Sequence, residues 1–335
     1  MRIKLIVLFL ISHLLIGAQI SDFEDVDFTK AENLAKMNEG TNIDNLPLLT
    51  HKLTYSLSTD IEKFRAIYFW VCHNIKGDYY QHNLVNRKRE KFKNDSLKYI
   101  TWNNAYKKIA FKKLREQKKT MCTGYAYLIK EMAFIAGIEC KIVDGYARSF
   151  ETNVNTLESF NHSWNAVWLN NKWYLCDATW SSGYMLNGNI FVKDYNDGYF
   201  LADPILFAKN HFPIEKKWFL NDSLKQKTFT PEPIVYGATF RHQIIPMTPQ
   251  PLYSDVIKND EVTFTFKALD DIDIKDVSLV QVLNKNHRTF KLYDLKNNDG
   301  IISFNYKFKQ KGTFDLHLKI KNDIVASYNF KVKKS

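Results

Sequence analysis

Three short stretches decide how this chain is interpreted: Thr-Met-Cys-Thr-Gly-Tyr-Ala (120–126), Asn-His-Ser-Trp-Asn (161–165) and Trp-Tyr-Leu-Cys-Asp-Ala-Thr-Trp (173–180). In chain order they supply a thiol, an imidazole and a carboxylate, from Cys122, His162 and Asp177. These are the groups that a cysteine nucleophile needs, namely the sulfur, the base that activates it and the group that orients the base. The order therefore indicates acyl-transfer chemistry, provided that the three side chains meet in the folded chain.

The stretch around Cys122 predicts the start of a helix, which Gly137 can end in the left-handed conformation. Free N–H groups and the positive dipole end at a helix N-terminus stabilise a thiolate and can bind an oxyanion. We also expect Gly124 to let the backbone pass close to a substrate. The predicted apolar face repeats at three- and four-residue steps through Ala126, Ile129, Met132, Ala133 and Ala136.

The stretches around His162 and Asp177 predict a β-hairpin. Two strand-like runs, at 163–169 and 172–179, flank a pair of asparagines, which tolerate the positive φ of a two-residue turn. With that turn, His162 and Asp177 lie on the same side of the sheet as diagonal neighbours. A slip of one residue would put them on opposite faces, so the predicted chemistry depends on the register.

The sequence before and after these stretches predicts an α+β domain. Thr59 and Glu62 have the spacing of a capping box, and apolar residues then recur at helical steps as far as Ile75. A strand-like run at 140–147 follows the predicted helices. Helices in the first part and strands in the second are typical of an α+β arrangement.

The character of the sequence changes near residue 228, where prolines become frequent. We interpret this stretch as a linker and the remainder as a small all-β sandwich that serves as a binding or spacer module. The predicted organisation is thus an α+β domain with a helical lead-in at 19–227, then linker and sandwich at 228–335. The predicted strands are 261–268, 277–283, 289–295, 301–308, 314–320 and 326–332.

Residues 1–18 have the pattern of a cleavable signal peptide. Arg2 and Lys4 form a charged start, an almost wholly apolar run follows, and Gly17-Ala18 precedes the predicted cleavage point. The run is short for a membrane span, although an uncleaved anchor is the alternative. We expect export to a secreted or periplasmic location.

The four cysteines are too few for a disulfide scaffold in a chain of 335 residues. No two of them have the spacing of a zinc site, so we expect neither a metal nor another cofactor. Cys72 lies near an apolar helix face, which predicts a packed thiol. A disulfide between Cys140 and Cys176 depends on a distance that the sequence does not supply.

Most of the positive charge, +11 overall, lies between residues 86 and 119, with thirteen basic and three acidic side chains. We expect a loop at 83–96 and a helix at 102–114. A charge run of this kind is most often a solvated helical face. In an exported protein it could also contact an anionic cell-envelope surface or steer acidic protein or peptide substrates toward Cys122; nucleic acid is not expected.

The three motifs resemble those of the transglutaminase-like superfamily, closest to its group of kyphoscoliosis peptidases and cytokinesis-associated transglutaminase-like proteins. The runs at 199–204 and 211–213 are similar to that group too, and the resemblance covers roughly residues 59–220. It implies a papain-like core of helices packed on an antiparallel sheet. It also implies that Cys122 is the nucleophile, His162 the base and Asp177 the partner of the base.

The resemblance implies a cysteine enzyme that attacks peptide or glutamine amide bonds through a thioester. Peptidase or amidase activity is favoured over cross-linking, because no feature marks a site for an acceptor lysine. The alternative is a catalytically silent transglutaminase-like scaffold or binding protein of the cell envelope. Such a protein would hold its partners with the sandwich and the basic surface.

Overall fold

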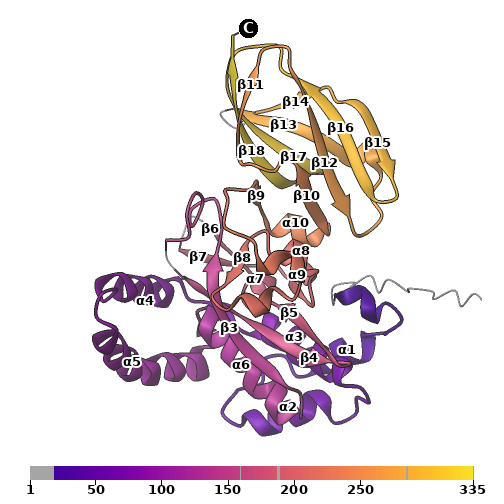
Figure 1. Ribbon diagram of the computed structural model, residues 1–335. Coiled ribbons are helices and arrows are strands. Elements are labelled where there is room, and N and C mark those ends of the chain that lie inside the picture. Colours follow the sequence, from indigo (N-terminus) through magenta and orange to yellow (C-terminus); the bar gives the residue numbers. More distant parts are fainter. Residues whose placement is uncertain (1–18, 159, 187–188, 284–285, 335) are drawn as a thin grey trace, which may run out of the picture.

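The computed structural model describes residues 19–158, 160–186, 189–283 and 286–334 (Figure 1). The predicted signal peptide lies outside these residues. Within them, no helix combines the length and the apolar character that crossing a membrane requires. The chain forms a mixed α and β part followed by an antiparallel β-rich part, as the sequence predicts.

Helices build one side of the first part. The central α3 (Asp60–Asn74) is capped by Thr59 and Glu62 in the predicted capping box. It packs against α1 (Thr29–Met37) and α2 (Leu46–Thr54), and also against α6 and α7. The predicted helix at Cys122 is α6 (Cys122–Ile135), and Gly137 follows it with φ of +80°.

A four-stranded antiparallel sheet in the order β5-β4-β3-β8 lies against α6. Asn170 and Asn171 form the predicted turn with φ of 45° and 62°, and Leu169 pairs with Lys172. The hairpin register is therefore confirmed. The strands are β3 (Cys140–Ala147), β4 (His162–Leu169), β5 (Lys172–Cys176) and β8 (His211–Pro213).

The second strand of the hairpin is shorter than the predicted 172–179. It ends at Cys176, and Asp177 becomes the N-cap of a short helix, α7 (Ala178–Ser182). The Asp177 carboxylate accepts hydrogen bonds from the N–H groups of Thr179 and Trp180, at 2.9 and 3.3 Å. Aspartate is among the preferred N-cap residues, so the local capping preference ends the strand.

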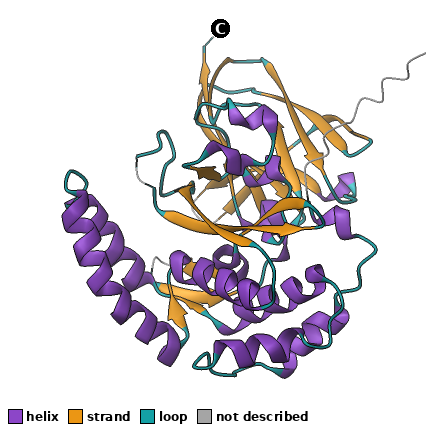
Figure 2. Ribbon diagram, turned by 60° about the horizontal axis from the view of Figure 1, so that its bottom comes forward, coloured by secondary structure: helices purple, strands orange, loops and turns teal. Residues whose placement is uncertain are grey.

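The predicted loop at 83–96 is wrong, because most of it is helical. Helix α4 (Tyr79–Lys91) begins at Asp78, α5 (Ser96–Gln117) begins at Asp95, and both aspartates cap the helix that follows. We call residues 79–117 the arm, and Figures 1 and 2 show its two helices standing away from the rest of the domain. The dense positive charge obscured the few buried positions of α4, which are Gln81 and Val85.

Two sheets form the C-terminal sandwich. One has the order β10 (Ile244–Thr248), β12 (Glu261–Ala268), β16 (Ile301–Lys307) and β15 (Tyr293–Asn298). The other has the order β11 (Tyr253–Ile257), β18 (Asp323–Lys333), β17 (Gly312–Ile320), β13 (Val277–Leu283) and β14 (Asn286–Phe290), with β9 (Ile234–Val235) also on β18.

The predicted strand at 289–295 is two strands in the structure. Phe290 pairs with Leu279 in one sheet, whereas Tyr293 pairs with Asn305 in the other. The chain crosses between the sheets at this point, and an alternating pattern alone does not show such a crossing.

The proline-rich stretch joins the two parts of the molecule through packed elements. It contains β9, β10 and α10 (Gly237–Arg241). The ring of Phe240 stacks on Tyr199 at 4.0 Å, and the amide of Asn196 donates to the Gly237 carbonyl at 2.7 Å. This stretch thereby becomes part of the wall of the site described below.

The remaining elements are short. They are η1 (Ile20–Phe23), β1 (Lys76–Gly77), β2 (Lys119–Thr120), β6 (Gly183–Leu186), β7 (Ile190–Lys193), η2 (Asp197–Tyr199), α8 (Pro204–Phe207), η3 (Lys216–Phe219), α9 (Asp222–Lys225) and η4 (Ile274–Asp276).

Candidate active site

Cys122 occupies the first position of α6, as predicted, and is only 3% exposed. Its N-cap residue, Met121, makes no side-chain cap, so the first N–H groups of the helix remain available to an anionic group. Gly124 has a different role from the one expected. A Cβ at Gly124 would lie 1.8 Å from the Thr120 hydroxyl, so the glycine makes room for Thr120 rather than for a substrate.

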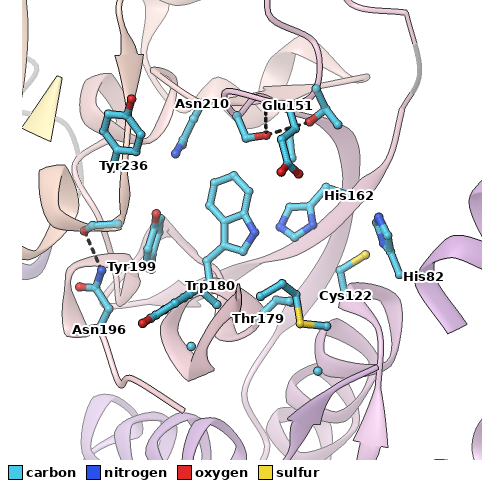
Figure 3. Close-up of a pocket in the computed structure, with 18 of the residues that line it drawn as sticks. His82, Cys122, Glu151, His162, Thr179, Trp180, Asn196, Tyr199, Asn210 and Tyr236 are labelled. Carbon is cyan, nitrogen blue, oxygen red and sulfur yellow. Dashed lines mark hydrogen bonds between the residues drawn. The ribbon is translucent and has the colours of Figure 1, made fainter. Parts of the chain in front are cut away.

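The structure brings the three predicted groups together at the end of the hairpin, and Figure 3 shows two of them, Cys122 and His162, beside the cavity. His162 Nε2 and Asp177 Oδ2 are 2.7 Å apart, and both side chains are buried. The His162 ring interacts with the Cys122 thiol, which also donates a hydrogen bond to the carbonyl oxygen of Asn161 at 3.9 Å. Because Asp177 holds Nε2, Nδ1 is the ring nitrogen left for the sulfur.

The electrostatics favour a thiolate beside an imidazolium. Burial acts to raise the pKa of Cys122, but its interactions with His162 and then with His82 lower this pKa to about 5. Burial acts to lower the pKa of His162, but the charge and hydrogen bond of Asp177, followed by those of Cys122, raise it to about 10. Between these two pKa values Cys122 is negative and His162 positive, which is the reactive ionisation state.

The other three cysteines have no such environment. All four thiols are free, so the structure contains no Cys140–Cys176 disulfide. Burial raises the pKa of Cys72 and Cys176 well above the usual value, and that of Cys140 to about 12. Cys72 is the packed thiol that the sequence predicts.

His211 on β8 extends the constellation beyond Asp177, and the sequence assigned it no role. Its Nε2 lies 3.2 Å from Asp177 Oδ2, and its ring stacks on Phe207 at 3.9 Å. Burial lowers the pKa of His211 to about 4, so the ring is neutral at pH 7. Asp177 Oδ2 faces Nε2, and Asn210 Oδ1 lies 2.7 Å from Nδ1, so the ring has a hydrogen-bond acceptor on each side. A neutral ring donates to only one of them, and it serves Asp177 through Nε2 when the Asn210 amide is turned so that its N–H faces Nδ1.

His162, Asp177 and His211 also meet the distance criterion for a metal site, because their ligand atoms lie within 4.8 Å of one another. Hydrogen bonds already connect both imidazoles to the same carboxylate oxygen. The proton that His162 shares with Asp177 occupies the nitrogen that a cation would need. The donor set therefore fits a proton network better than a metal.

A cavity of about 630 Å³ opens beside Cys122 and His162. Trp180 stacks on the His162 ring at a centroid distance of 5.0 Å. The wall comes from segments far apart in the sequence, including the arm, the 147–152 segment and the proline-rich stretch. Labelled members in Figure 3 are His82, Glu151, Thr179, Trp180, Asn196, Tyr199, Asn210 and Tyr236.

His82 is the second residue that the sequence did not reveal. It lies on α4, lines the cavity and is within hydrogen-bonding reach of the Cys122 thiol. The prediction of a loop at 83–96 removed the helical face that would have directed attention to it.

A cysteine at a helix start, facing a histidine on an antiparallel sheet and an aspartate directly after the next strand, is the arrangement of a papain-like site. Residues 48–178 match the family model of the Transglutaminase-like superfamily. This part of the chain is a transglutaminase-like domain.

The similar proteins agree with this assignment. Kyphoscoliosis peptidase from Homo sapiens is 34% identical over 204 residues, covering 60% of this chain and 27% of that protein. The protein of the same name from Mus musculus is 36% identical over 175 residues, covering 51% and 24%. Hillarin from Drosophila melanogaster is 26% identical over 237 residues, covering 66% and 26%. The chain thus spans about a quarter of the length of these relatives.

Proposed function

We propose that this protein is a cysteine peptidase or amidase that cleaves peptide or glutamine amide bonds through a thioester. The observation that carries the proposal is the position of Cys122 at the start of α6, beside the His162 ring that Asp177 holds at 2.7 Å, at the edge of the cavity. The name of the mammalian relatives, kyphoscoliosis peptidase, gives independent support.

In the proposed reaction the Cys122 sulfur attacks the carbonyl carbon, and the π electron pair moves to the carbonyl oxygen. When the oxyanion collapses, the C–N bond breaks and the leaving nitrogen takes the proton of His162 Nδ1. Water then attacks the thioester while His162 accepts a proton, and Cys122 leaves as the thiolate. Asp177 holds the imidazole in its working orientation throughout.

Hydrolysis is favoured over transfer to an amine. The charged groups on the cavity wall include an exposed pair, Arg241 and Asp194, at 2.7 Å, and buried Asp78, which pairs with Lys113. These two acids are already paired, which leaves Glu151 as the acid of the wall that an acceptor ammonium group could use. The peptidase name of the relatives is what favours hydrolysis.

The test is peptide turnover by the wild-type chain and the Cys122→Ala variant. The wild type should cleave members of a peptide or glutamine-amide library, and a labelled thioester should accumulate on Cys122 at short times. The variant should show neither. Cleavage at equal rates by both proteins would overturn the proposal.

A second candidate is a binding role at an anionic cell-envelope surface, for which the arm is the specific observation. Its helices carry most of the net charge, and Leu97 and Ile100 are 78% and 51% exposed beside Lys98. Apolar side chains among cations are typical of helices that lie on lipid surfaces. We propose that the chain is exported and that the arm also attracts acidic substrates.

Two measurements test these proposals. The secreted or periplasmic protein should begin at Gln19, and an intact Met1 on the protein would contradict export with cleavage. Vesicles with acidic lipids should retain the chain more strongly than neutral vesicles, and Leu97→Ser together with Lys98→Glu should reduce retention. Equal retention by both kinds of vesicle would exclude a lipid-binding arm.

A further inference from the structure

Cys122 lies between two imidazoles, and the proposed reaction uses only one of them. Figure 3 shows His162 on one side of the sulfur and His82 on the other. His82 is half-buried, lines the same cavity as Cys122 and acts to lower the pKa of the thiol. It comes from the arm, whereas His162 comes from the sheet.

Asn86, one helical turn after His82, selects the nitrogen that carries the ring proton. Asn86 Nδ2 lies 2.8 Å from His82 Nε2. An amide N–H donates, so Nε2 accepts and the proton of the neutral ring lies on Nδ1. Asn86 Oδ1 is buried without a hydrogen-bond partner among the described residues. In the opposite orientation of the Asn86 amide, Oδ1 would accept a hydrogen bond from His82 Nε2–H. His82 Nδ1 would then carry a proton only if the ring were the doubly protonated imidazolium.

The start of α4 holds His82 in a defined place. Gln81 Oε1 accepts a hydrogen bond from the backbone N–H of Met121, the residue before the nucleophile, at 3.1 Å. Asp78 caps the same turn, because its Oδ1 accepts a hydrogen bond from the backbone N–H of Gln81, also at 3.1 Å. The turn that carries His82 is therefore fastened directly to the loop that presents Cys122.

We propose that His82 donates a hydrogen bond to the oxyanion that forms when Cys122 attacks a carbonyl, together with the backbone N–H of Cys122. This inference rests on the proposed function. The new C–S bond forms as the C=O π pair moves to oxygen, and the resulting negative charge accepts the N–H of His82. Collapse of the oxyanion restores the C=O bond and expels the leaving group, while the His82 proton stays on its nitrogen.

The position of His82 suits this role. His162 already supplies the proton for the leaving group, so a second imidazole on the other side of the sulfur is free to serve the carbonyl oxygen. A donor fixed in a mostly buried site stabilises a developing charge more strongly than water does. His82 thereby complements the unpaired N–H groups at the start of α6.

The test compares two reactions of Cys122 in the full chain. Acylation by p-nitrophenyl acetate passes through an oxyanion, whereas alkylation by iodoacetamide displaces iodide at a saturated carbon and forms none. Both are measured at the same pH, about 8, so that any change in thiol ionisation caused by a substitution affects the two rates equally. His82→Phe keeps a ring without a donor, and His82→Gln keeps an N–H donor. Asn83→Ala is the control on the same helix.

We expect His82→Phe to slow acylation about 100-fold, the usual cost of one oxyanion donor, and to leave alkylation nearly unchanged. The acylation rate of His82→Gln should fall clearly less than that of His82→Phe. Asn83→Ala should be acylated at the wild-type rate. Equal losses in both reactions would assign His82 to thiol ionisation or to structure and overturn the proposal, as would no loss at all. If His82→Phe does not fold, the ratio of the acylation rate to the alkylation rate in His82→Gln tests the proposal. A ratio equal to that of the wild type would overturn it.

Failure of the proposed function has a different signature. In that case the wild-type chain is alkylated at Cys122 but is not acylated by p-nitrophenyl acetate. If only the His82 inference fails, the wild-type chain is still acylated. The His82 substitutions then slow acylation and alkylation equally, or slow neither reaction.

Discussion

The two sides of Cys122 are built differently. On the sheet side, His162, Asp177 and His211 are 5%, 0% and 1% exposed and are connected by hydrogen bonds at 2.7 and 3.2 Å. On the arm side, His82 is half-buried, and the oxygen of its partner Asn86 has no hydrogen-bond partner within the described part of the chain. The sheet side is a closed proton network, whereas the arm side is held by fewer contacts.

This difference separates two tasks. A buried and fully paired network fixes which nitrogen carries a proton, and acid–base chemistry requires that fixed arrangement. A less constrained side can adjust to the substrate that enters the cavity. The predictions below test each side in turn, and the largest expected effect comes first.

Asp177→Asn should have the largest effect, because it removes the charge that keeps His162 protonated while retaining an N-cap for α7. We expect peptide turnover to fall on the order of 10³- to 10⁴-fold. The pKa of His162 should fall, and the pKa of the Cys122 thiol should rise. The measurements are steady-state kinetics and the titration of His162 by NMR.

A loss of less than about tenfold in Asp177→Asn would show that the sheet side is not the acid–base side. The thermal stability of the variant serves as its control. If the fold is intact, the kinetic loss belongs to the chemistry.

His211→Leu should have an intermediate effect. It removes one hydrogen bond from buried Asp177, so we expect a destabilisation of about 1–3 kcal/mol and roughly tenfold slower turnover. The pH at which activity is lost on the acidic side should rise. Denaturant unfolding and a pH–rate profile measure the two effects.

The matched control for His211→Leu is His242→Leu. His242 pairs with Asp323 at 2.8 Å in the sandwich region, where both groups are partly exposed. This control should change stability by no more than about 1 kcal/mol and leave turnover unchanged. Equal effects of the two substitutions would deny His211 any role at the site.

Gln81→Leu should have the smallest effect, on the arm side. It leaves the buried N–H of Met121 without its acceptor, at a cost of about 1–3 kcal/mol in local stability. Faster hydrogen exchange at Met121 and a several-fold loss of turnover are expected. Asn83→Ala is the control, and unchanged exchange in Gln81→Leu would contradict the fastening of the arm to the nucleophile loop.

Local sequence patterns predicted the sheet side well. The pair Asn170-Asn171 fixes the turn, the turn fixes the register, and the register puts His162 and Asp177 on one face. The capping box at Thr59 and the helix start at Cys122 are equally local, and both were confirmed.

Tertiary contacts account for what the sequence did not predict. His211 reaches Asp177 from β8, and His82 reaches Cys122 from α4, across long sequence separations. The capping preference of Asp177 ended the second hairpin strand early, and the charge of the arm concealed a helix. For the two histidines a contact between distant segments determined the outcome, whereas the strand end and the arm helix depend on local capping that the strand and charge patterns concealed.

The most informative measurement is the rate of Cys122 alkylation by iodoacetamide as a function of pH, with Cys122→Ala to identify the labelled site. The folded thiol has its pKa lowered to about 5, below that of an unfolded cysteine. Its rate should therefore already be half-maximal near pH 5 and remain high at neutral pH. A single rise of the alkylation rate centred on about pH 8.5, the ordinary pKa of a free thiol, would contradict the thiolate–imidazolium pair.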